Sequence, residues 1–442
     1  MVNAHYKWLL LVMAAGFFHA GPSVAAGPLG LPGGGLGLPG NVLPNVLERT
    51  TGPVNTTLDR TLGTATGVLR DAVGRPRRAD LFDRDLLGAR VLRQTVLALS
   101  PGSESLAIAR RLGFEVLREE QIASLGLSVV RLRIPAGIGV AEALARLRAA
   151  DPAGIYDFDH IYDPSGEGAA SVAEPAPAAT HPAAKIRIGM IDGGIDRDHR
   201  DFADAEITQR NFANRKDSVP TPHGTAVASL LIGEDIAGTL PRAELYAADV
   251  YGGEAAGGAA DDIARALGWL VSNQVAVVNI SLAGPPNAIL QAAVKAFSRG
   301  GRVIVAAAGN DGPAAPVEYP AGYAGVVAVT SVDERFNIQL DANQGAYIAF
   351  AASGVDRRVA KSGGGHTTVT GTSYAAPQVA VRFAVLLRQA DDASLRAARA
   401  ALERDAHDLG VPGRDPVFGY GYLAPLGQGS GASVLRQSQR TQ

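Results

Sequence analysis

The sequence predicts an α/β fold built on a parallel sheet, preceded by a small α+β domain. The first observation is a set of short, mostly apolar segments, as expected for parallel strands that are buried on both faces: 275–282, 302–308 and 326–330. The second is a pair of apolar helical segments, 226–232 and 378–387. The third is a separate stretch, 90–163, whose strand and helix patterns follow the order β-α-β-β-α-β.

Length and composition fit a protein with more than one folded unit. The chain has 442 residues, of which 47% are hydrophobic and 19% are charged, and this balance favours a sizeable core. Its net charge of −2 gives no reason to expect nucleic acid or an anionic membrane as a partner. Because the chain has no cysteine, disulfides, thiol chemistry and Cys-ligated metals are excluded.

Residues 1–26 have the pattern of a signal peptide. His5 and Lys7 precede an apolar run over 8–18, and small residues at 23–26 offer a cleavage site after Ala25 or Ala26. The run is too short to cross a bilayer as a stable helix, so we expect no transmembrane span after cleavage. The mature protein is then exported, periplasmic or extracellular. An uncleaved N-terminal anchor is the alternative.

Three segments are expected to be linkers or tails. Residues 27–89 are rich in Gly and Pro, although apolar residues at helical spacing predict a short amphipathic helix within 54–73. Residues 164–184 form a second linker, rich in Ala, Pro, Gly and Ser. Residues 427–442 form a flexible tail.

The stretch 90–163 has the pattern of a small packed domain. We expect strands at 95–99, 114–117, 127–134 and 155–162, with helices at 103–112 and 140–149. This order is that of a ferredoxin-like fold. By itself it says nothing about function.

Polar residues follow the strands of the larger domain, 185–426. Asp192 ends the strand that begins at 185, and functional sites of open α/β sheets lie beyond such carboxyl ends. His223 stands between Pro222 and Gly224, just before the helical segment 226–232. Each has a plain alternative, since an Asp before two glycines often only forms a turn and a lone His is often structural.

Two further residues could stabilise an oxyanion. Asn310 follows the strand 302–308 within Gly-Asn-Asp-Gly, and Ser373 lies at the start of a helix, where free N–H groups favour negative charge. Pro377 fits the first turn of that helix. The alternatives are an Asn that makes a turn and a Ser that caps a helix.

Together these four residues have complementary chemistry. A serine hydroxyl is a poor nucleophile until a base takes its proton, and histidine suits that task near neutral pH. A carboxylate such as Asp192 would hold the imidazole tautomer and stabilise the imidazolium. The side chain of Asn310 and the backbone N–H of Ser373 could bind the oxyanion.

Four blocks resemble the signature blocks of the subtilisin-like serine proteases: Ile191–Asp196, His223–Thr225, Ala308–Asn310 and Gly371–Pro377. The resemblance covers about 185–425 and implies a serine endopeptidase on a doubly wound, mostly parallel sheet. It implies Asp192, His223 and Ser373 as catalytic triad and Asn310 as oxyanion donor. It also implies that Ser281, Leu282, Ala283 and Gly284 pair with the backbone of protein or peptide substrates and wall the specificity pocket.

The resemblance gives the ferredoxin-like domain a role as a pro-domain that inhibits the site until it is removed. Its last strand and the linker 164–184 are then expected to lie across the site, with self-cleavage in or just before that linker. Gly193 departs from the family, which usually has Ser or Thr after the catalytic Asp. The sequence predicts no required cofactor and no clear metal site, and it leaves calcium open.

Two other function classes are alternatives to a protease. A catalytically silent peptide-binding module could use the same fold. An esterase of the α/β-hydrolase type would require a G-x-S-x-G motif and the chain order Ser, Asp, His, and this sequence has neither around Ser373.

Overall fold

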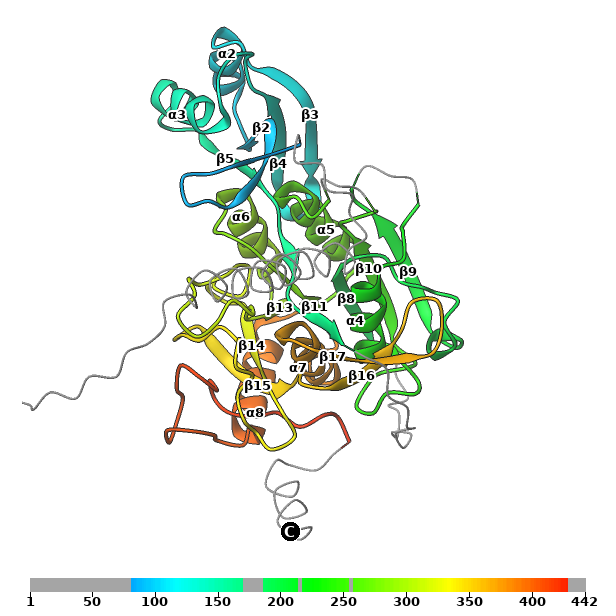
Figure 1. Ribbon diagram of the computed structural model, residues 1–442. Coiled ribbons are helices and arrows are strands. Elements are labelled where there is room, and N and C mark those ends of the chain that lie inside the picture. The colour runs from blue at the N-terminus through cyan, green and yellow to red at the C-terminus, as the bar shows by residue number, and fades with distance from the viewer. Residues whose placement is uncertain (1–80, 170–185, 214–216, 254–256, 428–442) are drawn as a thin grey trace, which may run out of the picture. The chain divides into compact units, whose positions relative to one another are not determined.

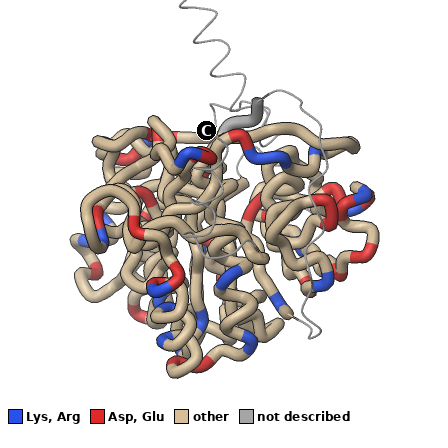
Figure 2. The backbone as a smooth tube through the Cα atoms, turned by 90° about the horizontal axis from the view of Figure 1, so that it is seen from below, with Lys and Arg blue, Asp and Glu red and all other residues tan. Residues whose placement is uncertain are grey.

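The computed structural model describes residues 81–169, 186–213, 217–253 and 257–427 (Figure 1). The predicted signal peptide 1–26, the linker and helix predicted before residue 81, most of the second linker and the tail from 428 lie outside the described residues. Within the described part of the chain, no helix has the length and apolar character needed to cross a membrane. Positive and negative residues are interspersed along the backbone, in line with the small net charge (Figure 2).

The small domain has the predicted order of strands and helices. Its antiparallel sheet runs β3-β4-β2-β5, with β1 also paired to β2, which is the ferredoxin-like arrangement. The elements are β1 (Phe82–Arg84), β2 (Arg90–Leu99), α2 (Ser103–Arg111), β3 (Glu115–Ile122), η2 (Ala123–Leu125), β4 (Leu127–Arg133), α3 (Val140–Ala150) and β5 (Ile155–His160).

Two boundaries of this domain differ from the prediction. The expected linker up to residue 89 contains β1, and β3 continues to Ile122 rather than ending at 117. Charged residues occupy positions 118–120 of β3, and alternate residues along the strand are exposed, so a search for apolar runs ended the strand too early.

The small domain packs both faces of its sheet. One face and its helices form an apolar cluster that includes Val96, Leu132 and Leu144. The other face contributes Leu97, Ile122 and others to a cluster shared with α5 and α6 of the larger domain. Burial of both faces holds the small domain against those two helices.

The larger domain is built on a seven-stranded sheet in the order β15-β14-β13-β11-β8-β10-β9, and every neighbouring pair is parallel. This confirms the predicted doubly wound α/β fold. The strands are β8 (Arg187–Asp192), β9 (Glu206–Asn211), β10 (Glu244–Asp249), β11 (Val277–Ile280), β13 (Val303–Ala307), β14 (Val327–Val332) and β15 (Ile348–Ser353).

Helices cover both faces of this sheet. On one face lie α4 (Pro222–Ile232), α7 (Thr372–Leu386) and α8 (Asp392–Asp405), whose apolar residues share a cluster with Met190 and Val305. On the other lie α5 (Ala260–Ser272) and α6 (Ala288–Phe297), in a cluster with Ile191 and Ile304. Successive strand residues therefore belong to opposite clusters, as the pleat requires.

Short strands outside the main sheet hold the chain between the two domains. The predicted strand 275–282 breaks at Ser281, because β12 (Leu282–Ala283) leaves the sheet and pairs antiparallel with β6 (Asp163–Pro164). Further along, β7 (Glu167–Ala169) adds to the hairpin of β16 (Arg357–Ala360) and β17 (His366–Thr370). The first residues of the segment predicted as a linker are thus paired strands.

The helix α7 begins five residues before Pro377, which lies inside it rather than in its first turn. A proline at this point has no N–H for the carbonyl of Ser373, four residues earlier. The hydroxyl of Ser281 supplies the missing donor, at 2.9 Å from that carbonyl oxygen. The helix continues because the lost backbone bond is replaced.

Candidate active site

Ser373 is the second residue of α7 and is fully buried. Its backbone N–H is one of the helix's unpaired first-turn donors, and it donates to the carbonyl oxygen of Ser165 at 3.0 Å. The hydroxyl of Ser373 donates to the carbonyl oxygen of Ser281 at 3.0 Å. Both groups of Ser373 therefore face the strand pair β6–β12.

Asp192 and His223 lie side by side. Asp192 ends β8 and His223 is the second residue of α4, a helix that Thr221 caps by accepting from the N–H of Gly224. Nδ1 of His223 lies 2.9 Å from Oδ1 of Asp192, which also accepts from the N–H of Gly193 at 2.6 Å. This arrangement fixes Nδ1 as the protonated nitrogen and leaves Nε2 as a base.

Nε2 of His223 is buried and has no hydrogen-bond partner among the described residues. The hydroxyl of Ser373 is turned to Ser281 instead. A rotation of the serine side chain about χ1 would be needed to bring the hydroxyl to the imidazole, and such bonds commonly tighten only during reaction.

Asn310 follows β13 and offers its amide donors to the same place. Its Oδ1 accepts from the N–H of Thr372 and from Gln339, at 3.1 and 3.0 Å, so Nδ2 points the other way. Nδ2 is buried without a partner among the described residues. A Cβ placed on Gly371 would lie 3.4 Å from Nδ2 and 3.0 Å from the carbonyl oxygen of Ser165. The carbonyl oxygen of Ser165 and the unpaired Nδ2 of Asn310 therefore both lie next to Gly371, where the amide could donate to an oxyanion.

The predicted segment 281–284 contributes mainly through its backbone. The carbonyl of Ser281 accepts from the N–H of Ser165 at 3.2 Å, and Leu282 and Ala283 pair with β6. Leu282 turns its side chain into the core, while Ala283 and Gly284 line a cavity. The partner of β12 in this structure is thus the chain's own segment 163–164.

The chain's own segment 163–169 lies in an extended form in the groove that is bordered by β12 and β17. β6 pairs with β12 on one side of Ser165 and β7 pairs with β17 beyond Gly166. The fit around the peptide bond between them is close, because a Cβ on Gly371 would come within 2.7 Å of the Cα of Gly166. A Cβ on Gly166 would in turn come within 2.7 Å of the ring of Tyr374.

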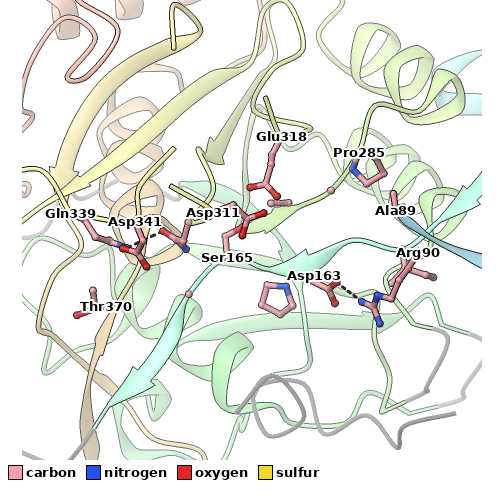
Figure 3. A pocket seen from close by; sticks show the side chains of 16 residues that line it. Ala89, Arg90, Asp163, Ser165, Pro285, Asp311, Glu318, Gln339, Asp341 and Thr370 are labelled. Carbon is pink, nitrogen blue, oxygen red and sulfur yellow. Dashed lines mark hydrogen bonds and ion pairs between the residues drawn. The ribbon is translucent and has the colours of Figure 1, made fainter. Parts of the chain in front are cut away.

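A cavity of about 420 Å³ opens beside Ser165 (Figure 3). It is lined in part by residues that the sequence patterns did not single out, Asp311, Glu318 and Asp341. Glu318 is the most unusual of them, because burial and then the negative charge of Asp311 raise its pKa to about 8. A signal was present in the sequence, since Glu318 is a charged residue within the otherwise uncharged stretch 312–332.

One cluster among the described residues has the donors of a metal site, Asp201, Asp235 and His366. Each of them already has a partner, however. His366 contacts Asp201 at 2.9 Å through Nε2 and Arg358 through Nδ1, and Asp235 pairs with Arg200 at 2.7 Å. Arg200, which also lies 3.9 Å from Oδ1 of Asp201, supplies positive charge to both carboxylates.

Comparisons with known proteins identify the family. A sequence model of the subtilase family matches residues 183–421, more than half of the chain. The minor extracellular protease Epr of Bacillus subtilis (strain 168) is 32% identical over 261 residues, which is 58% of this chain and 40% of Epr. Subtilisin BL of Lederbergia lenta is 35% identical over 235 residues, 51% of this chain and 84% of that protein.

The solved structure of fervidolysin from Fervidobacterium pennivorans, described as a keratinolytic enzyme related to subtilisin, has the same fold. Its TM-score is 0.63 at 20% identity, over 78% of this chain and 61% of that one. The chain spans less than half of Epr and about three fifths of the fervidolysin chain. The family match and the shared parallel sheet agree: the chain belongs to the subtilase family of serine proteases.

Proposed function

We propose that this protein is an exported serine endopeptidase that forms an acyl-enzyme on Ser373 and first cleaves its own Ser165–Gly166 bond. In this proposal Asp192, His223 and Ser373 are the catalytic triad, and Asn310 and the N–H of Ser373 bind the oxyanion. The domain 90–163 is the pro-domain, and protein or peptide chains are the later substrates.

The observation that carries the proposal is the position of Ser165. Its N–H donates to the carbonyl of Ser281 and its own carbonyl oxygen accepts from the N–H of Ser373. A peptide chain held by this pair of bonds presents the carbonyl carbon of Ser165 next to the serine hydroxyl. Holding the reacting groups in place in this way replaces an encounter between two molecules.

The chemistry then follows from the groups present. Ser373 Oγ attacks the carbonyl carbon of Ser165 while Nε2 of His223 takes the hydroxyl proton, and Asp192 stabilises the imidazolium. The negative charge on the carbonyl oxygen is met by the N–H of Ser373 and by Nδ2 of Asn310. When the C–N bond breaks, the nitrogen of Gly166 leaves as an amine with the proton from His223. Water then hydrolyses the ester between Ser165 and Ser373.

The same contacts support an inhibitory role for residues up to 165. Strand β6 fills the groove beside β12, and a substrate strand would need that edge. A second substrate is therefore excluded while the domain 90–163 and β6 stay in place. Export is proposed from the signal-peptide pattern of 1–26. N-terminal sequencing of the secreted or periplasmic product would test it.

Mass spectrometry of the purified full chain beside Ser373→Ala tests this proposal. The expected wild-type products end at Ser165 and begin at Gly166, while the variant stays whole. Labelling with a fluorophosphonate probe, expected for the wild type and absent in the variant, reports the nucleophile without reference to any substrate.

Different results would point elsewhere. Cleavage of both proteins at the same bond would assign processing to another protease. Two whole chains, with no labelling of the wild type, would favour the silent peptide-binding module. The present direction of the Ser373 hydroxyl, away from His223, is the observation that keeps this alternative worth testing.

A further inference from the structure

The cavity beside Ser165 is acidic where a substrate side chain would enter it. Asp311 follows Asn310 directly, the carboxyl group of Glu318 points toward that of Asp311, and both residues line the cavity together with Asp341 (Figure 3). We propose that this pocket selects Lys or Arg at the residue before the cleaved bond in external polypeptides, with Glu318 as the residue that determines the preference. The inference rests on the proposed endopeptidase function and specifies its substrates.

The backbone fixes Glu318 against the wall of the pocket. The next residue, Tyr319, exchanges two hydrogen bonds with Gly284, at 3.0 and 2.8 Å, and so pairs antiparallel with the end of the segment 281–284. The carboxyl group of Glu318 lies over Gly309, where a Cβ would come within 1.8 Å of Oε2. A side chain at position 309 would clash with this carboxyl group, so the position requires glycine. Gly309 directly precedes the predicted oxyanion donor Asn310 in the chain.

The charges around Glu318 are negative or already paired. Asp311 shares a hydrogen bond with it, Asp163 adds a weaker negative charge, and Tyr347 and Asn343 are the neutral neighbours. Arg90, the cation that lines the cavity, is bonded to Asp163. Within the described residues no cation is paired with Glu318 or Asp311. A guest ammonium or guanidinium group would supply the missing positive charge.

The chain's own residue at this position does not reach the acids. Ser165 has a short side chain, and its buried hydroxyl has no partner among the described residues. Self-cleavage can succeed without this contact because the bond is held within the same molecule. An external chain lacks that advantage, and it would benefit from a long side chain whose apolar stem crosses the cavity and whose charge meets Glu318.

A double-mutant cycle in the full chain tests the pocket without requiring catalysis. In the uncleaved Ser373→Ala background, Ser165→Lys and Ser165→Met place chains of similar length in the cavity. We expect the lysine variant to unfold at a higher temperature than the methionine variant, by about 2 °C or more. Adding Glu318→Gln should remove that difference, while Glu334→Gln, a loss of the same charge at an exposed site, should leave it. Equal melting temperatures, or a difference that survives Glu318→Gln, would overturn the assignment.

Peptide kinetics provide a second readout, on enzyme that labels with the fluorophosphonate probe. Matched peptide p-nitroanilides ending in Lys or Phe should differ in kcat/KM by on the order of tenfold or more in favour of Lys. Glu318→Gln should reverse the order and Glu334→Gln should not. If the enzyme is labelled by the probe but prefers Phe, the proposed preference for Lys or Arg is wrong and the proposed endopeptidase function stands. Absence of labelling would count against the proposed function. In that case the melting temperatures of the Ser165 and Glu318 variants would still show whether the pocket favours a positively charged side chain.

Discussion

The hydroxyl of Ser281 donates a hydrogen bond to the carbonyl oxygen of Ser373 across 2.9 Å. That carbonyl is the one that Pro377 leaves without its helical partner. Ser281 Oγ also accepts from Nδ2 of Asn279, so the hydroxyl is oriented from both sides. The start of α7, with Ser373 on it, is thereby fixed to the strand that binds the chain's own segment.

Replacement of Ser281 by alanine is expected to lower the free energy of unfolding by about 1–3 kcal/mol, because the buried carbonyl of Ser373 loses the hydroxyl that stands in for the missing proline N–H. Urea unfolding of the intact Ser373→Ala chain would measure this. Ser331→Ala is the matched control, since its buried hydroxyl has no partner among the described residues and its removal should cost little. Equal losses in the two variants would contradict the explanation.

Asn310 has two roles that two substitutions can separate. Asn310→Ala removes both the amide donor and the acceptor for the N–H of Thr372, while Asn310→Asp keeps an acceptor oxygen. We expect kcat to fall in both, by about 10²- to 10³-fold in the alanine variant, with KM little changed. Stability should fall mainly in the alanine variant. A selective increase in KM would argue against oxyanion binding.

The absence of a hydroxyl at Gly193 has a steric explanation that the sequence did not reveal. A Cβ at this position would lie 2.2 Å from Oγ1 of Thr221, the cap of α4. Gly193→Ser alone is therefore expected to destabilise the protein by about 1–3 kcal/mol. Thr221→Gly, a cap change that costs only a few tenths of a kcal/mol by itself, should relieve most of that loss in the double variant. Thermal unfolding of the four proteins checks the coupling.

Specificity should depend on pH through Glu318. Burial and then the negative charge of Asp311 raise its pKa to about 8, so the Glu318 carboxyl group is mostly neutral at pH 6 and negative at pH 9. We expect the ratio of kcat/KM for Lys over Phe peptides to rise between these values. The ionisation of groups that act on both peptides, such as His223, affects both kcat/KM values equally and therefore cancels in the ratio. In Glu318→Gln the ratio should be flat.

Under the proposed self-cleavage, release of the cleaved domain 90–163 should be easier at higher pH. Asp159 and Arg131 of the small domain form an ion pair, and Arg131 also pairs with Asp261 of the larger domain. Burial raises the pKa of Asp159 to about 7, because its effect outweighs the attraction of Arg131. A raised pKa in the docked state means that this group favours docking at low pH, and that the advantage is lost as pH rises through 7. Size-exclusion chromatography of cleaved protein at pH 6 and 8 should show more separation at pH 8. Asp159→Asn should weaken that difference.

The four sequence blocks predicted the family because each block is a local pattern at a strand end or helix start. Contacts made over long distances in the chain could not be found in that way. β6 and β7 lie in a segment whose Ala, Pro and Gly content is typical of a linker, and they become strands only by pairing with β12 and β17. Likewise, only the folded chain brings Thr221 against Gly193, or Glu318 beside Asp311.

The strands on either side of Ser165–Gly166 are held independently, β6 by β12 and β7 by β17. Cutting that bond breaks neither ladder, so the first product would be a nicked molecule with both new ends still in place. The cut and the appearance of activity toward other proteins would then be separate events. The interval between them would act as a delay, set by how slowly β6 and its domain dissociate from the groove.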